Sequence, residues 1–281
     1  MVGYLDKSKY PGIDGVLPGL DQSRILSSQD ALLWDYGHEE TTRAINEFAF
    51  RAETEAKFDL GYLRFTREPI EVGPFAFVDF VDVRVNHYMI KSNDSVQYVF
   101  GELGRSGGVR DFVSRCLSKA DELGLDTRSR YAYLTVDQNP VEPGKTQRES
   151  GWHIDGMQGT EVPEKKPADF QFIWTDATPT RFCTQTFDVE GLDVARHNVF
   201  NWLSRQVAEQ TCYSLREGTI YLMNAYHVHT ATPAKERLYR RFVRLSFTNT
   251  PITSVKMTPN PDIHYNYPTG VTSGDIPKGL V

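Results

Sequence analysis

The feature that most constrains the fold is a series of short segments, in the second half of the chain, that are rich in β-branched and aromatic residues. These segments are Tyr131–Val136, Trp152–Asp155, Phe170–Trp174, Arg181–Phe187, Gly218–Asn224 and Arg241–Thr248. Turn-forming residues separate them, and a short helix expected over Asn198–Glu209 interrupts the series. Many short strands divided by turns are typical of a β-sandwich or barrel. The sequence therefore predicts a mainly β fold with flanking helices.

The first half of the chain carries two longer predicted helices. Apolar residues recur at helical spacing over Glu39–Lys57 and again over Val109–Leu123, where Gly124 is placed to end the helix. Leu60–Phe65 and Phe75–Tyr88 are instead expected to be extended, the latter because it is dense in β-branched and aromatic residues. We expect the helices to support the sheet-rich second half.

The 281 residues are expected to form a single domain. We divide it into an irregular N-terminal arm (residues 1–38), a helix-rich support with strands (39–130), a β core (131–250) and an extended C-terminal tail (251–281). Hydrophobic residues make up 40% of the chain, which is ordinary for a globular protein with a sizeable core.

Charge and composition narrow the possible partners. The net charge of -6 argues against a nucleic-acid-binding protein, which would normally carry a basic stripe. No stretch approaches the roughly 20 apolar residues of a membrane span, and Met1–Lys7 lacks the apolar segment of a secretory signal. Cys116, Cys183 and Cys212 are odd in number and far apart, which suits reduced thiols. We expect a cytoplasmic protein without a nucleic-acid or membrane partner, and the sequence indicates no oligomeric state.

A candidate metal site begins at His153 and Asp155. Side chains two residues apart on a strand leave the same face, so these two can bind one ion together while Ile154 points the other way. Alone, such a pair is weak evidence, because a strand end can carry both residue types by chance.

A second histidine from a later strand would complete one face of a coordination octahedron. His229 follows the apolar segment Thr219–Met223 and precedes Pro233 by four residues, which places it at a strand end. His227 competes with it, because two residues apart on an extended segment both rings can face the metal. We favour His229, and the spacing alone leaves both open.

The last feature of the candidate site is an arginine within an apolar strand. Arg244 and Ser246 share one face of Arg241–Thr248, and the residues that alternate with them are apolar. A buried arginine is costly unless an anion pairs with it, and its planar guanidinium can bind a carboxylate through two hydrogen bonds. A structural ion pair with one of the acidic residues is the alternative. Arg240 and Arg241, at the strand entrance, are expected to be solvated.

The order of these parts resembles that of the Fe(II)/2-oxoglutarate-dependent oxygenases: H-x-D, then about seventy residues to a histidine, then R-x-S. The resemblance covers residues 131–250, and His229–Pro233 is similar to the distal-histidine segment of small-molecule hydroxylases in that superfamily. It implies a double-stranded β-helix, or jelly-roll (cupin-like) core, with the helical N-terminal region as its support.

The resemblance also implies the cofactors and roles. His153, Asp155 and His229 would be the catalytic iron ligands, and Arg244 and Ser246 would bind the distal carboxylate of 2-oxoglutarate. With O₂ as the further substrate, hydroxylation of a small molecule is the default outcome. Desaturation, cyclisation and epoxidation use the same ligands. Asp155 argues against halogenation, because halogenating relatives have a small residue in its place.

Other polar residues are candidates for the lining of the pocket. Tyr133, on the strand before the H-x-D pair, could touch 2-oxoglutarate through its hydroxyl, and Gln158, Arg181 and Gln185 could also face the pocket. Two alternatives remain for the function: a jelly-roll metalloenzyme, such as an iron oxidase, that needs no 2-oxoglutarate, and a non-catalytic binding module.

Overall fold

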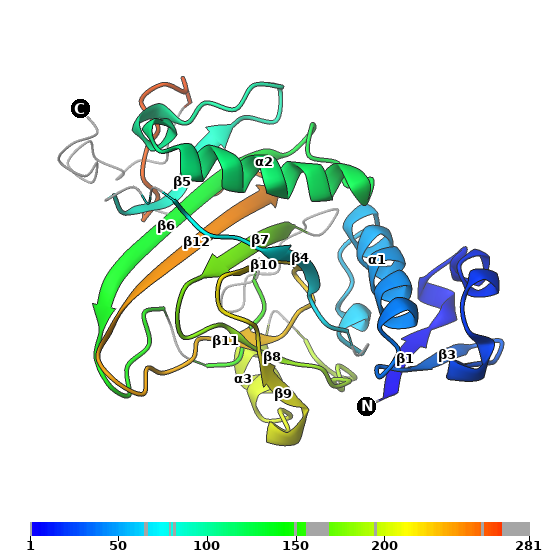
Figure 1. The fold of residues 1–281 in the computed structure, drawn as a ribbon. Helices are drawn as coiled ribbons and strands as arrows, with labels where there is room; N and C mark the ends of the chain where they lie inside the picture. Colours follow the sequence, from blue (N-terminus) through cyan, green and yellow to red (C-terminus); the bar gives the residue numbers. More distant parts are fainter. Residues whose placement is uncertain are drawn as a thin grey trace.

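The structure, a computed structural model, describes residues 2–64, 67–78, 80, 83–148, 151–155, 169–193, 196–253 and 256–265. Its centre is a six-stranded antiparallel sheet (Figure 1). In spatial order the strands are β4 (Ile70–Pro74), β10 (Thr219–Asn224), β7 (Phe170–Thr175), β12 (Leu238–Thr248), β6 (Tyr131–Val141) and β5 (Val85–Lys91). The predicted mainly β fold with few helices is confirmed.

One face of this sheet is apolar and is covered by a helix. Helix α2 (Gly107–Glu122) lies across it, as Figure 1 shows, and Phe112 and Cys116 of the helix are fully buried. The strand residues facing the helix belong to the same core cluster, among them Phe172, Val243 and Leu245. Alternation along each strand places every second side chain on this face. The apolar residues of β12, which alternate with its polar ones, therefore pack against the helix.

The opposite face of the sheet packs against a small sheet of three strands. These are, in order, β11 (His229–Thr230), β8 (Arg181–Cys183) and β9 (Cys212–Ser214). Ile173 and Phe242 of the large sheet pack with Phe182 of the small one. The space between the two sheets holds the polar half of the β12 pattern, including Arg244 and Ser246.

The N-terminal residues form a third sheet, which corrects the expectation of an irregular arm. Strands β1 (Val2–Asp6), β2 (Ile25–Ser27) and β3 (Ala31–Asp35) pair in the antiparallel order β1-β3-β2, and short 3₁₀ helices join β1 to β2. Leu32 and Trp34 are buried together with Ile45 and Ala49 of helix α1 (Glu39–Glu55). The few apolar residues of this segment are therefore enough to stabilise the third sheet, because α1 supplies the rest of their core.

Two segments predicted to be extended differ from the prediction. Leu60–Arg64 is a 3₁₀ helix. Within Phe75–Tyr88, only the part from Val85 is strand, and Phe75, Phe77 and Phe80 lie outside any strand among the residues described there. Phe77 packs edge-on against Trp174 with ring centroids 4.6 Å apart. Aromatic residues that resemble a strand in sequence thus cover the apolar face of the sheet as a loop.

Two further segments differ from the prediction. Trp152–Asp155 forms only an isolated bridge at His153, and the helix predicted over Asn198–Glu209 is the shorter α3 (Val199–Ser204). Beyond the β core, residues 251–253 and 256–265 contain no helix or strand, and the rest of the predicted tail lies outside the described residues.

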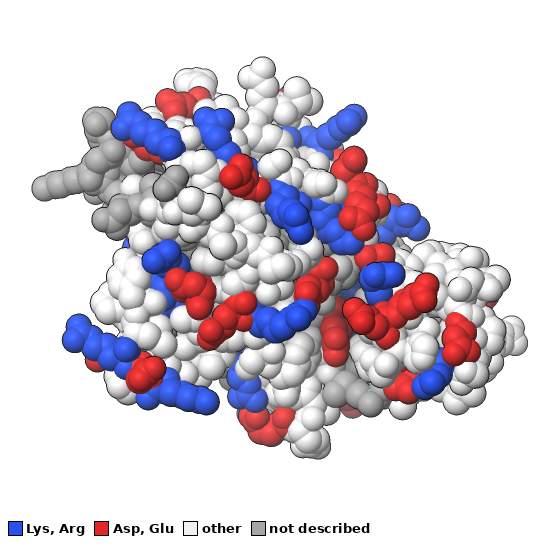
Figure 2. Space-filling view, viewed as in Figure 1, with Lys and Arg blue, Asp and Glu red and all other residues white. Residues whose placement is uncertain are grey.

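No helix within the described ranges is both long enough and apolar enough to cross a membrane. On the face shown in Figure 2, basic and acidic side chains are intermixed.

Candidate metal centre

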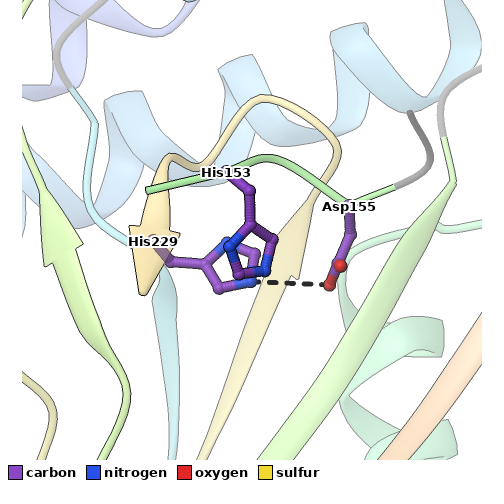
Figure 3. A group of neighbouring side chains, drawn as sticks. All are labelled: His153, Asp155 and His229. Atoms are coloured by element: carbon purple, nitrogen blue, oxygen red, sulfur yellow. Dashed lines mark ion pairs between the residues drawn. The ribbon is translucent and has the colours of Figure 1, made fainter. Parts of the chain in front are cut away.

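The side chains of His153, Asp155 and His229 meet between the two sheets. One candidate ligand atom from each residue lies within 4.8 Å of the others, and His229 Nε2 is 3.6 Å from Asp155 Oδ2. Figure 3 shows both imidazoles and the carboxylate pointing toward a common point. The structure thus brings together the three residues predicted as metal ligands.

Two backbone hydrogen bonds hold the histidines side by side. The amide of His153 donates to the carbonyl of His229, and the amide of His229 donates to the carbonyl of His153, both at 2.9 Å. In such an antiparallel pair the two side chains leave the same face, and the ring centroids here are 4.4 Å apart. Ile154 is buried in a separate apolar cluster, as its alternation with His153 and Asp155 predicts.

The tautomers of both histidines leave Nε2 available for a metal. His153 Nδ1 lies 2.7 Å from the carbonyl oxygen of Gly151, and His229 Nδ1 lies 2.9 Å from that of His227. A carbonyl oxygen only accepts, so each Nδ1 is the donor, and in the neutral form of either ring Nε2 carries the lone pair. Burial lowers the pKa of His229 to about 4, so this ring is neutral at neutral pH.

The carboxylate of Asp155 is surrounded by positive and donor groups. Gln171 donates a hydrogen bond to Oδ2, and Arg244 NH1 lies 3.6 Å from the same atom. Burial acts to raise the pKa of Asp155, but the attraction of His229 and Arg244 outweighs it, and this pKa lies well below its ordinary value. Asp155 is therefore ionised across the neutral range, as a metal ligand must be.

His227 lies away from this cluster. Its side chain is buried, with Nδ1 2.9 Å from Asn224 Oδ1, and its ring is edge-on to that of Phe182. Burial holds its pKa well below the ordinary value. The geometry therefore brings His229 rather than His227 to Asp155, while the ligand role itself stays a prediction.

Arg244 occupies the predicted face of β12 and is almost completely buried. Its side chain is 9% exposed, its one ion pair within the described part of the chain is with Asp155, and its Nε has no hydrogen-bond partner there. Burial and the nearby Arg148 lower its pKa to about 10. Arg240, which was expected to be solvated, is also buried. Its Nε donates to the carbonyl oxygens of Ala177 and Thr178, and these hydrogen bonds compensate for the loss of water.

Tyr133, Ser246 and Gln171 lie side by side on neighbouring strands. Ser246 is the register partner of Tyr133 on β6 and of Gln171 on β7. Ser246 Oγ donates to Gln171 Oε1 at 3.3 Å, and the fully buried Tyr133 accepts a hydrogen bond from the amide of Ile252. Gln171, which joins Ser246 to Asp155, was not among the sequence candidates. A glutamine alternating with the aromatic residues of β7 was the signal that could have indicated it.

The remaining candidates have structural partners. Arg181 forms an ion pair with Glu209 at 2.6 Å, and the Gln185 side chain accepts a hydrogen bond from the amide of Ala208. Gln158 lies outside the described residues. None of these contacts connects Arg181 or Gln185 to the three clustered side chains.

Comparison with known proteins yields distant structural likenesses. No protein-family model and no curated protein matches the sequence. Among solved structures, EvdO2 from Micromonospora carbonacea var. aurantiaca complexed with 2-oxoglutarate is 15% identical, with a TM-score of 0.36 over 56% of this chain and 69% of that one. AviO1 from Streptomyces viridochromogenes Tue57 is 14% identical, with a TM-score of 0.35 over 73% and 94%. The non-heme monooxygenase ThoJ, in its apo form, is 11% identical, with a TM-score of 0.37 over 79% and 88%. These values assign neither a family nor an activity.

Proposed function

We propose that this protein is a non-haem Fe(II)- and 2-oxoglutarate-dependent oxygenase that hydroxylates a small molecule. The observation that carries the proposal is the convergence of His153, Asp155 and His229. Two neutral imidazoles and one ionised carboxylate on one side of an ion, with the other positions open, are the donor set of non-haem Fe(II) oxygenases. Structural zinc sites are instead closed and tetrahedral, and a catalytic zinc site would leave the unused donors of Arg244 beside these ligands unexplained. The residues therefore fit Fe(II).

Arg244 supports 2-oxoglutarate as the co-substrate. The buried guanidinium of Arg244 has one anionic neighbour among the described residues, a carboxylate at 3.6 Å, beyond hydrogen-bonding distance, so it has unused donors beside the candidate metal ligands. The distal carboxylate of an oxoacid would accept from this guanidinium, with Ser246 as a further donor and Tyr133 nearby on the same face. In an iron enzyme that needs no 2-oxoglutarate, Arg244 would serve Asp155 alone and its remaining donors would stay unused.

When bound, iron would couple the oxidative decarboxylation of 2-oxoglutarate by O₂ to hydroxylation of the substrate, with one oxygen atom of O₂ entering succinate, the other entering the product, and CO₂ released. The residues of this chain hold and orient the reactants. Gln171 and Arg244 keep Asp155 ionised and fixed, and the carbonyls of Gly151 and His227 fix the two imidazoles. The burial of His229, Arg244 and Ser246 limits the access of water on that side of the site.

We also propose that the two facing sheets form a double-stranded β-helix. The order of the strands supports this assignment, because successive strands are divided between the sheets. Strands β7, β10 and β12 belong to the large sheet, whereas β8, β9 and β11 belong to the small one. The site lies between them, where a jelly-roll encloses a ligand.

The decisive experiment is a titration of the Fe(II) protein with 2-oxoglutarate under anaerobic conditions. Chelation of the oxoacid should produce a weak visible charge-transfer band, and admission of O₂ should release succinate. The Asp155→Ala variant is the control and should give neither signal. A wild-type protein that binds Fe(II) but develops no band would refute the dependence on 2-oxoglutarate. Screening small molecules for faster succinate release would then identify the substrate class.

A further inference from the structure

A fully buried carboxylate joins the N-terminal region to the turn that precedes His229. Glu53, on α1, is 0% exposed. It accepts hydrogen bonds from the hydroxyl of Tyr10, from Arg67 and, at 2.7 Å, from Asn224 Nδ2. Burial raises the pKa of Glu53, while Arg67 acts in the opposite direction. These donors come from separate parts of the chain, so the carboxylate ties three segments to one point.

Asn224 uses both ends of its side chain. It is the last residue of β10 and is 1% exposed. Its Oδ1 accepts a hydrogen bond from the amide of Tyr226 at 3.0 Å and lies 2.9 Å from His227 Nδ1, while its Nδ2 donates to Glu53. The carbonyl end of the amide therefore shapes the turn of residues 224–227, and the amine end attaches that turn to α1.

This turn sets the direction of the His229 ring. The carbonyl oxygen of His227 accepts from His229 Nδ1 at 2.9 Å, so a rotation of the turn would rotate the imidazole with it. Phe182 fills the space beside both rings, stacked on His229 with centroids 5.5 Å apart and edge-on to His227 at 6.3 Å. The position of His229 Nε2 thus depends on where the turn lies.

A buried charged network is an expensive way to pack a core, because apolar side chains of similar volume would be as stable or more so. Its particular property is directionality, since each hydrogen bond is satisfied in one arrangement only. Partners that orient metal ligands contribute about 10–100-fold to metal affinity. A network that ends at a predicted ligand is placed to make such a contribution.

We infer that Glu53 and Asn224 are positioning residues for His229: Glu53 holds Asn224, Asn224 holds the turn, and the His227 carbonyl aims the His229 imidazole at the metal. The inference rests on the proposed metal site. It assigns the N-terminal region, whose Tyr10 completes the bonds of the carboxylate, a part in building the centre.

The test compares two variants that each remove one neutral donor from the same carboxylate. Asn224→Ala cuts the link between Glu53 and the turn, and Tyr10→Phe leaves that link intact. Co(II), which is stable in air, replaces Fe(II), and its affinity is measured by calorimetry together with its visible d–d spectrum. We expect Asn224→Ala to lose about 10–100-fold in Co(II) affinity and to shift the bands. Tyr10→Phe should lower the melting temperature but keep the wild-type affinity and spectrum.

A folded Asn224→Ala protein with wild-type Co(II) affinity and spectrum would overturn the inference, and so would an equal loss of affinity in Tyr10→Phe. If Asn224→Ala does not fold, His227→Phe decides instead. It keeps a ring between Phe182 and the core but removes the contact with Asn224, and it should lose about 10-fold in affinity. Unchanged binding in His227→Phe would also overturn the inference. Wild-type protein that binds no Co(II) would refute the metal site itself, which is a separate outcome.

Discussion

Replacing Arg244 with methionine should separate co-substrate binding from folding. In the structure the Arg244 side chain is 9% exposed, and its ion pair with Asp155 spans 3.6 Å. Its Nε has no partner among the described residues. Methionine has a similar length and a flexible, apolar side chain that fills irregular space. The Arg244→Met variant therefore removes the charge while largely preserving the packing between the two sheets.

The expected effects on stability and on binding differ. Burial lowers the pKa of Arg244 to about 10, so the folded state disfavours the charged side chain. Removing this side chain also takes the cationic neighbour away from the carboxylate of Asp155, which acts on stability in the opposite direction. The free energy of unfolding should therefore change little. Two lost hydrogen bonds to a carboxylate, each worth about 1.5–3 kcal/mol, should weaken 2-oxoglutarate binding roughly 10²–10⁴-fold.

Urea denaturation of the metal-free protein measures the first effect, and anaerobic titration of the Fe(II) protein measures the second. Arg240→Met is a matched control, because Arg240 is on the same strand and equally buried but bonds to the carbonyls of Ala177 and Thr178. The control should lose stability and keep its oxoacid affinity. An Arg244→Met protein that is clearly destabilised yet binds 2-oxoglutarate like the wild type would refute the reasoning, since Arg244 would then be a structural partner of Asp155.

Three further predictions follow from the site and the core. Asp155→Ala should weaken Co(II) binding, measured by calorimetry, by more than about 100-fold, because losing a ligand exceeds the cost of losing a ligand's partner; near-normal affinity would contradict the ligand assignment. A metal concentration of 100 times the dissociation constant should stabilise the folded protein by about 2.7 kcal/mol; a melting temperature indifferent to metal and chelator would contradict specific binding. Phe112 is 0% exposed, so Phe112→Ala should lower the free energy of unfolding in urea by about 3–5 kcal/mol while leaving metal affinity unchanged, and a comparable loss of affinity would tie α2 to the site.

Period-two alternation was sufficient to predict much of the candidate site. It placed His153 and Asp155 on one side of their segment with Ile154 on the other, and it separated Arg244 and Ser246 from the apolar half of β12. Such local rules hold because a strand offers only two faces. The spacing could not choose between two histidines of equal parity. The structure pairs His229, and not His227, with His153, through an isolated bridge beside β11 of the small sheet.

Other features depend on contacts between distant segments and were therefore not predicted. The strand-like aromatic residues near Phe77 form a loop because Trp174 and the sheet offer them an apolar surface. The N-terminal segment forms a sheet because α1 completes its core. The Glu53 network joins three separate regions, and nothing at Glu53 itself distinguishes it from the other acidic residues of an amphipathic helix.

The reciprocal hydrogen bonds between His153 and His229 have a consequence for the order of folding. The two residues are far apart in the chain, so bringing them together costs the conformational entropy of closing the loop between them. Strands of the large sheet are further apart still, since Thr248 pairs with Tyr131 and Leu222 with Ile70. A chain that has not completed all of these long-range pairings would therefore lack a place for the ion. Metal uptake by newly made chains would then report that folding is complete.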